Sequence, residues 1–326
     1  MTDSNQKFTI YHQGADRSLV ILYVHGADSR DYLQRMVSCD LSRISPEQGS
    51  RGTLLDGKGR IVAAFDLLQW SEGFLLVTGQ GESVSLKTRL ESMVILEDVE
   101  IETDSHQWLH LYGEESASAL HPLGTPVPGS FLACQCSDQG LLVNRPRFHP
   151  SGFDLLVTTE QRDSQASVFA EIAECATDEQ RDQGRILLGL PKVGAEIGER
   201  TLPPEVGLGD AVAYDKGCYA GQEVLARIRT YGHVNREIRR VEFTDLVGEA
   251  EPAVGDDLFP SLNDEKPVGQ ITSIARTSDG WAAIASMRYK FLKDAGPEEK
   301  VIWNRGGNPE SIGVLKPVFA PEYGNS

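Results

Sequence analysis

The chain has 326 residues, 24% charged and 40% hydrophobic, a composition that excludes disordered and membrane-spanning classes and predicts two or three folded domains. Lys and Arg total 31 against 48 Asp and Glu, a net charge of −17, which disfavours general binding to nucleic acid or anionic lipid. We therefore expect neither direct nucleic-acid binding nor a membrane partner.

The chain contains five cysteines, Cys39, Cys134, Cys136, Cys175 and Cys218, which are too scattered for a disulfide framework. No apolar targeting region opens the chain. A reducing, cytoplasmic setting is therefore expected. The first four cysteines stand in apolar contexts, so we expect them to be buried and Cys218 to be the most reactive thiol.

The first part of the chain alternates between strand and helix patterns. An apolar run ends at His25-Gly26, and Asp28 or Ser29 can cap the helix that follows. The turn Ser71-Glu72-Gly73 is typical of a hairpin. We expect strands over 18–24, 60–70, 74–78, 94–101 and 108–112, and helices after residue 28, over 83–93 and over 114–120.

The alternation continues with strands over 131–136 and 153–157 and a helix over 165–175. A further helix begins at Thr177, which has capping-box spacing to Gln180, and ends near Gly189.

The helical period disappears after about Arg236. Short strands over 238–243, 268–276, 281–289 and 301–303 then predict a small antiparallel barrel or sandwich. Its expected core consists of Val241, Phe243, Leu258, Val268, Ile271, Ile274, Ile284 and Ile302.

Five arginines gather between residues 227 and 240: Arg227, Arg229, Arg236, Arg239 and Arg240. This pattern is as typical of a solvated face as of a surface that receives an anion.

His106 and His110 have the spacing of zinc ligands on a helix, but their segment alternates like a strand. On a strand the two side chains lie about 13 Å apart. No metal site is therefore expected.

The segment from Asp215 to Glu223 places Cys218 beside Lys216 and between Gly217 and Gly221. A nearby positive charge and a helix N-terminus favour thiolate, and the glycines allow close approach. The same residues are equally typical of a tight turn with an inert thiol.

A long series of motifs carries a family resemblance. The run Lys216-Gly217-Cys218-Tyr219-Ala220-Gly221-Gln222-Glu223 resembles the signature of the YgfZ-type branch of the glycine-cleavage T-protein (aminomethyltransferase) superfamily. The runs 55–61, 152–154, 185–196 and 268–273 also resemble elements of that superfamily, so the similarity covers nearly the whole chain.

The resemblance implies an α+β fold with two ferredoxin-like lobes in residues 1–235 and a C-terminal antiparallel β-barrel in residues 236–326. It also implies a channel that receives tetrahydrofolate. Cys218 would be the functional thiol and Lys216 its activator. Tyr219, Gln222, Glu223, Arg227 and the position of Leu187 would shape the cofactor site.

Two departures from the superfamily bear on activity. The transferases carry an acidic residue where this chain has Val62, Ala63 and Ala64, and a folate-binding Glu where it has Leu187. Methylene transfer at a folate amine needs a proton-handling group, which Ala and Leu lack. The chain is therefore expected to lack aminomethyltransferase activity, and whether it is an enzyme stays open.

The resemblance points to a tetrahydrofolate-binding factor for iron–sulfur cluster assembly or repair, and thereby for tRNA modification, with iron–sulfur proteins as partners. The alternatives are a one-carbon transferase or demethylase acting on an amine, and a folate-binding scaffold. Client protein and oligomeric state are open at this point.

Overall fold

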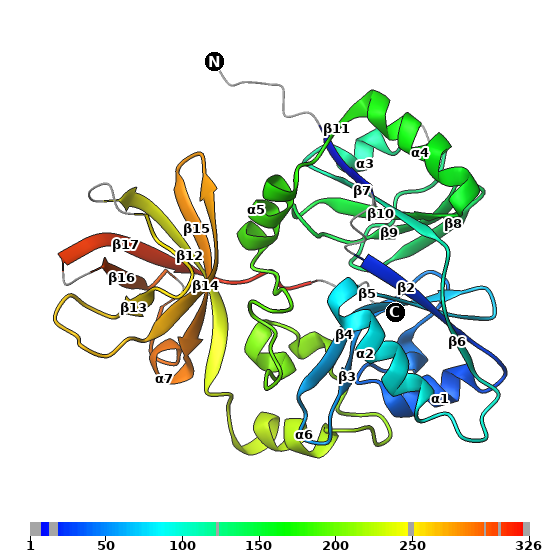
Figure 1. Ribbon diagram of the computed structural model, residues 1–326, viewed down its shortest axis with the longest axis horizontal. Helices are drawn as coiled ribbons and strands as arrows, with labels where there is room; N and C mark the ends of the chain where they lie inside the picture. Colours follow the sequence, from blue (N-terminus) through cyan, green and yellow to red (C-terminus); the bar gives the residue numbers. More distant parts are fainter. Residues whose placement is uncertain are drawn as a thin grey trace. The chain divides into compact units, whose positions relative to one another are not determined.

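The computed structural model describes residues 8–12, 19–121, 124–246, 251–296, 298–305 and 308–321 (Figure 1). The chain divides into two compact units. Unit 1 comprises Met1–Ala176, Asp210–Ala226 and Pro321–Ser326, and unit 2 comprises Thr177–Gly209 and Arg227–Ala320. Unit 2 thus groups the segment Thr177–Gly209 and the end of the segment before residue 236 with the barrel. The predicted boundary at residue 235 assigns both to the first domain.

Unit 1 contains two sheets. The first has the strand order β3-β4-β5-β2-β6 and the second the order β11-β1-β7-β10-β9-β8. The first is built from β2 (Leu19–His25), α1 (Ser29–Met36), β3 (Ser50–Leu55), β4 (Ile61–Trp70), β5 (Gly73–Gly79), α2 (Gln80–Glu91) and β6 (Glu100–Thr103). The second is built from β1 (Phe8–His12), β7 (Gln107–Tyr112), α3 (Ser116–Ala119), β8 (Cys134–Ser137), β9 (Gly140–Asn144), β10 (Gly152–Val157), α4 (Thr159–Ile172) and β11 (Ala173–Cys175).

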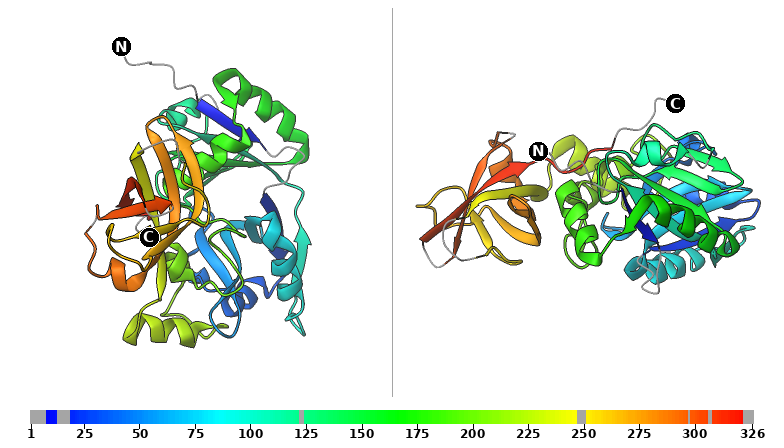
Figure 2. Two further views of the ribbon diagram at one scale, coloured as in Figure 1. Left: turned by 60° about the vertical axis from the view of Figure 1, so that its left-hand side comes forward. Right: turned by 90° about the horizontal axis from the view of Figure 1, so that it is seen from above.

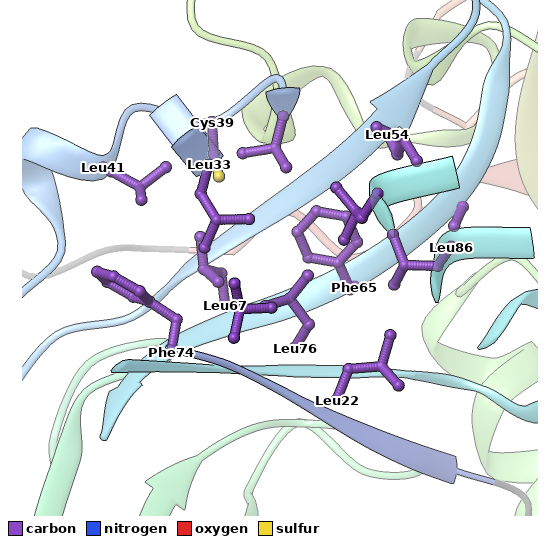
Figure 3. Packing of buried hydrophobic residues seen from close by; sticks show 14 of the residues in the cluster. Leu22, Leu33, Cys39, Leu41, Leu54, Phe65, Leu67, Phe74, Leu76 and Leu86 are labelled. Carbon is purple, nitrogen blue, oxygen red and sulfur yellow. The ribbon is translucent and has the colours of Figure 1, made fainter. Parts of the chain in front are cut away.

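The first sheet turns one face toward α1 and α2. Alternate residues of β4, Ala63, Phe65 and Leu67, are buried there against Leu33 of α1 and Leu86 of α2. Figure 3 shows this packing together with Leu22, Cys39, Leu41, Leu54, Phe74 and Leu76. The apolar alternation of a half-covered strand therefore decides which face of the sheet the helices cover.

The second sheet repeats this arrangement with α4. Leu109 and Leu111 of β7 and Phe153 and Leu155 of β10 pack in one buried cluster with Phe169 of α4. The residues between them on the same strands point to the helix-free face of the sheet.

Buried ionic side chains connect the helix-free faces of the two sheets. Asp66 of β4 accepts hydrogen bonds from Nε of Arg145 at 2.8 Å and from Nη2 of Arg147 at 3.1 Å. Arg147 also donates to Asp154 of β10 at 2.6 Å, and Asp154 lies 2.7 Å from Nδ1 of His110 on β7. We call these five residues the Asp66–Asp154 network.

The network is closed to solvent, since the side chains of Asp66 and Asp154 are 5% and 3% exposed. Burial alone would raise the pKa of Asp154, but Arg147 and His110 outweigh it and hold that pKa below its usual range. Removing one member leaves the others buried without their counter-charge.

We therefore expect Asp154→Asn to lower the free energy of unfolding by about 3 kcal/mol at neutral pH, because Arg147 loses a buried charge partner. Urea unfolding checks this. Asp163→Asn on α4 is the control, since that side chain is 93% exposed. Equal stability of the two variants would contradict the role given to the network.

Unit 2 contains a closed antiparallel barrel with the strand order β12-β15-β14-β13-β16-β17 (Figure 2). Its elements are α5 (Asp178–Leu188), the part of α6 (Gln222–Tyr231) from Arg227 on, β12 (Arg236–Leu246), β13 (Asp257–Phe259), β14 (Gly269–Thr277), β15 (Gly280–Arg288), α7 (Tyr289–Leu292), β16 (Lys300–Arg305) and β17 (Asn308–Lys316). The predicted α+β fold with a C-terminal barrel is confirmed. Among the described helices, none is long and apolar enough to cross a membrane.

Helix α5 is attached to the barrel by a buried polar cluster. Arg185 donates to Glu196 at 3.2 Å and to Oγ of Ser273 on β14 at 2.9 Å. The hydroxyls of Ser273 and Thr272 donate to Oε1 of Glu196 at 2.6 and 2.7 Å. The motif of residues 185–196 and the motif of residues 268–273 therefore form one structural unit.

Two predictions about local structure were wrong. Val94 to Val99 is a loop rather than a strand, because the Glu97 carboxylate accepts hydrogen bonds from the N–H groups of Ile95 and Leu96 and closes a tight turn. In the barrel, Val301 and Trp303 point inward while Ile302 between them is only half-buried, since neighbouring strand residues face opposite sides.

Candidate functional site

Residues 210–221 of unit 1 pack on the carboxyl end of α1. The N–H of Ala213 donates to the carbonyl of Ser38 at 2.8 Å, and the Ser38 hydroxyl donates to the carbonyl of Ala211 at 2.5 Å. Arg43 pairs with Asp215 at 2.7 Å. The segment that leads into the signature motif is thus held at Ala211, Ala213 and Asp215.

Lys216 is the central anchor of this segment. Its Nζ donates to the carbonyl oxygens of Gln34, Val37 and Cys39 at 2.7, 2.6 and 2.6 Å. These are all three of its donors, and they occupy carbonyls at and just beyond the end of a helix, where a positive charge is favourable. Burial lowers the pKa of Lys216 to about 8, against the opposing effects of Cys39 and Asp40.

The second attachment joins two glycines. Gly221 has φ +80° and Gly59 has φ +76°, and a Cβ on Gly221 would lie 2.6 Å from the Cα of Gly59. Only glycine permits this conformation and this close approach together. The Gly59-Arg60-Ile61 hairpin and the signature motif, 162 residues apart in sequence (221 − 59), therefore touch backbone to backbone.

The remaining motif residues divide between structural and exposed positions. Tyr219 is buried, donates from its hydroxyl to the carbonyl of Ala213 at 2.7 Å, and lies with its ring 5.0 Å from Nζ of Lys216. Gln222 donates to the carbonyl of Lys216 at 3.2 Å. Cys218 and Glu223 are exposed.

The structure therefore brings Lys216, Tyr219 and Gln222 together. All three donations of the Lys216 ammonium go to backbone carbonyls, those of Gln34, Val37 and Cys39, and none goes to Cys218. That Lys216 activates Cys218 stays a prediction, and the role that the geometry supports for Lys216 is to hold the loop that presents Cys218.

The exposure of the thiols corrects one expectation. Cys39 and Cys134 are buried, and burial raises the pKa of each to about 12. Cys136 and Cys175, expected to be buried, are exposed like Cys218. Cys136 lies on β8 and Cys175 ends β11, the two edge strands of the second sheet. Cys134 starts the same strand β8 but lies against the segment of Glu47, whose carbonyl accepts its N–H at 2.8 Å.

A buried carboxylate reaches the strand at Ala64, one of the positions where the family resemblance led us to note a missing acid. Glu82 of α2 is 7% exposed, and its Oε1 accepts the N–H of Ala64 at 3.0 Å. The pairing of β4 with β5 ends at Phe65 and Thr78, so Glu82 satisfies a strand N–H that lacks a neighbour. Burial raises the pKa of Glu82 to about 7, against the opposing hydrogen bond from Ala64.

The position of Leu187 offers no such group. Its side chain is 37% exposed, and its carbonyl accepts a hydrogen bond from Arg240. Glu196 of the same unit cannot replace the missing carboxylate, because Arg185, Thr272 and Ser273 already use its oxygens. Leu187 and Arg227 both belong to unit 2.

Sequence reasoning missed His110, which it considered only as a metal ligand. Its ring stacks between Trp108 and Tyr112, with centroids 5.7 and 5.5 Å away, and its Nε2 has no hydrogen-bond partner in the described part of the chain. Burial lowers the pKa of His110, against the opposing hydrogen bond to Asp154. The alternation Trp108, His110, Tyr112 was the available signal. Among the described residues no cluster of three metal-ligating side chains occurs.

A separate cavity of about 510 Å³ lies between β2, α1 and the β4–β5 hairpin, lined among others by Tyr23, His25, Arg30, Glu72 and Phe74. None of the predicted site residues lines it.

The buried carboxyl of Glu82 gives a pH-dependent stability. Its folded pKa of about 7 exceeds the ordinary value of 4.5, so the unfolded chain loses this proton first and stability falls as pH rises between these values. We expect Glu82→Gln to be about 2 kcal/mol more stable than the parent at pH 8 and equal to it near pH 4.

Urea unfolding at the two pH values measures the effect. Glu91→Gln, at the exposed end of the same helix, is the matched control and is expected to change little at either pH. A Glu82→Gln advantage of the same size at both pH values would show that the carboxyl does not titrate as described.

Comparisons with known proteins agree with this fold. No protein-family model matches the chain. The tRNA-modifying protein YgfZ of Aliivibrio fischeri (strain MJ11) is 23% identical over 299 residues, 88% of each chain. YgfZ of Sodalis glossinidius is 27% identical over 276 residues, 81% of this chain and 80% of the relative. The structure of glycine cleavage system aminomethyltransferase T from Bartonella henselae matches with a TM-score of 0.80 at 18% identity, over 94% of this chain and 85% of that one.

The structural likeness confirms the fold, and the curated relatives confirm the resemblance that the signature motif indicated. The chain is thus similar to the YgfZ proteins over most of its length and carries the fold of the glycine-cleavage aminomethyltransferase.

Proposed function

We propose that this chain is a tetrahydrofolate-binding protein of tRNA modification that acts by assembling or repairing iron–sulfur clusters of client enzymes. The name of its relatives, tRNA-modifying protein, supports the process. The observation that carries the chemical part is the presentation of Cys218: an exposed thiol on a loop held at Lys216 and Gly221.

A thiol acts on a client when it is accessible and its backbone is held in place. The Lys216 bonds and the Gly59–Gly221 contact hold the loop on both sides of Cys218, and the side chains of Lys216 and Tyr219 turn inward. Cys218 is the reactive group that this loop leaves exposed, next to residues that only support it.

The two positions at which the resemblance led us to note a missing carboxylate, Ala64 and Leu187, differ in how well they suit tetrahydrofolate. Glu82 provides a protonatable carboxyl at Ala64, which suits an N–H group of a pterin ring. Leu187 provides none. Bound tetrahydrofolate would supply a one-carbon carrier, and in this chain Glu82 is the residue that would accept the N–H group of its ring.

Cys218→Ser should lower the modification of tRNA nucleosides made by iron–sulfur enzymes severalfold in cells that lack the native gene. The reason is that a hydroxyl cannot replace the thiol, although the exposed site costs little stability. Mass spectrometry of tRNA hydrolysates measures the effect. Cys136→Ser and Cys175→Ser, which also change exposed thiols, are the controls and should restore full modification. Rescue by Cys218→Ser equal to the parent would refute the role of this thiol.

Tetrahydrofolate should bind without turnover. At a concentration 100 times Kd, it should raise the free energy of unfolding by about 2.7 kcal/mol. One-carbon exchange with an amine should not exceed the rate without protein, because Glu82 is buried and bonded to Ala64. Calorimetry and a transfer assay distinguish the alternatives. If calorimetry shows no heat of binding and the Tm does not change, tetrahydrofolate is not a ligand of this chain. If the chain transfers one-carbon units and Glu82→Gln abolishes that transfer, the chain is a one-carbon transferase instead.

A further inference from the structure

Three cations without ion pairs among the described residues lie in unit 2, where β12 begins and β15 ends. Arg236, Arg288 and Lys290 are all exposed, and we call them the basic patch. None of the three forms an ion pair with a carboxylate in the described part of the chain, in contrast to Arg239 and Arg240, which pair with Glu237 and Glu242 at 2.9 Å.

The pairing of the strands forces two of these charges together. Arg236 and Arg288 stand directly opposite each other in the β12–β15 ladder, a placement of like charges that disfavours folding. The acidic group that acts on Arg236 is Glu205, whose carboxylate already accepts the N–H of Leu202 at 2.9 Å. Glu205 offsets at most one of the three positive charges, so the patch keeps a net positive charge.

Aromatic rings lie next to the patch. His233 and Tyr289 stack with ring centroids 4.2 Å apart and an angle of 18°, and the N–H of Tyr289 donates to the carbonyl of Asn235 at 2.9 Å, which fixes α7 to the segment before β12. Tyr231, the last residue of α6, stands two residues before His233 in the sequence and is 88% exposed. A phenol ring so fully in water makes little contribution to the fold.

We propose that this surface of unit 2 binds RNA, with the basic patch on the phosphate backbone and Tyr231 and His233 against unpaired bases. Cations beside exposed aromatic faces are the combination that binds single-stranded nucleic acid, because phosphates need charge and bases need a flat apolar partner. An acidic protein would use the cations but would leave the rings without a function.

The net charge of −17, which led us to expect no nucleic-acid partner, acts at long range and lowers affinity. It does not remove a local contact, since salt screens charges more than about 8–10 Å away. The inference goes beyond the proposed function, which requires no contact between this chain and RNA.

The test is fluorescence anisotropy of the full chain with a tRNA and with an unstructured RNA oligonucleotide at several salt concentrations. Replacing the patch with Arg236→Gln, Arg288→Gln and Lys290→Gln should weaken binding at least tenfold and reduce the slope of log K against log salt by about 2. Tyr231→Ala should weaken binding to the oligonucleotide about fivefold or more without changing that slope.

The control carries the same change of charge elsewhere: Arg89→Gln, Lys266→Gln and Lys300→Gln, all at exposed positions. It should bind like the parent, and the patch variant should keep the parent Tm. Failure of the parent to bind either RNA, equal weakening by the control, or binding of polyglutamate as tight as that of RNA would overturn the proposal. None of these results bears on the Cys218 experiment in cells, so the two ideas fail separately.

Discussion

The arrangement of unit 1 depends on the buried Asp66–Asp154 network. Two sheets that are covered by helices on one side each need a partner for the other side, and in this chain that partner is the opposite sheet with charges in between. Buried ion pairs gain little stability over an apolar contact, but they have a fixed geometry and leave a large penalty when they are broken. The network thereby specifies how the strands that carry Asp66 and Asp154 lie against each other.

Much of the fold follows from local sequence. Thr177 accepts the N–H of Gln180 at 3.2 Å and Gly189 ends the helix at φ +70°, as their spacing predicted. The hairpin at Ser71 also forms where expected, between β4 and β5. Local signals fail where a side chain alters the backbone, as Glu97 does in its turn, or where burial changes within one strand, as it does between Cys134 and Cys136 on β8. The cover over Cys134 comes from the segment of Glu47, which the sequence around the cysteines does not reveal.

The candidate site was predictable in position but less so in the roles of its residues. A lysine two residues from a cysteine suggests electrostatic activation, yet the partners of Lys216 are carbonyls 177 to 182 residues away. A missing acid at Ala64 suggested a lost function, yet a carboxyl reaches that amide from α2. In both cases the decisive contact comes from another element, 177 to 182 residues away for Lys216 and 18 residues away for Ala64.

The two buried thiols lie in different parts of unit 1: Cys39 in the core between the first sheet and its helices, and Cys134 at the start of an edge strand of the second. A buried thiol reacts with a labelling reagent only when its surroundings open. The labelling rates of Cys39 and Cys134 therefore each report the free energy of a local opening. The native chain therefore contains two internal probes, one for each sheet, that need no introduced label. They can reveal whether the sheets open as one cooperative structure or separately.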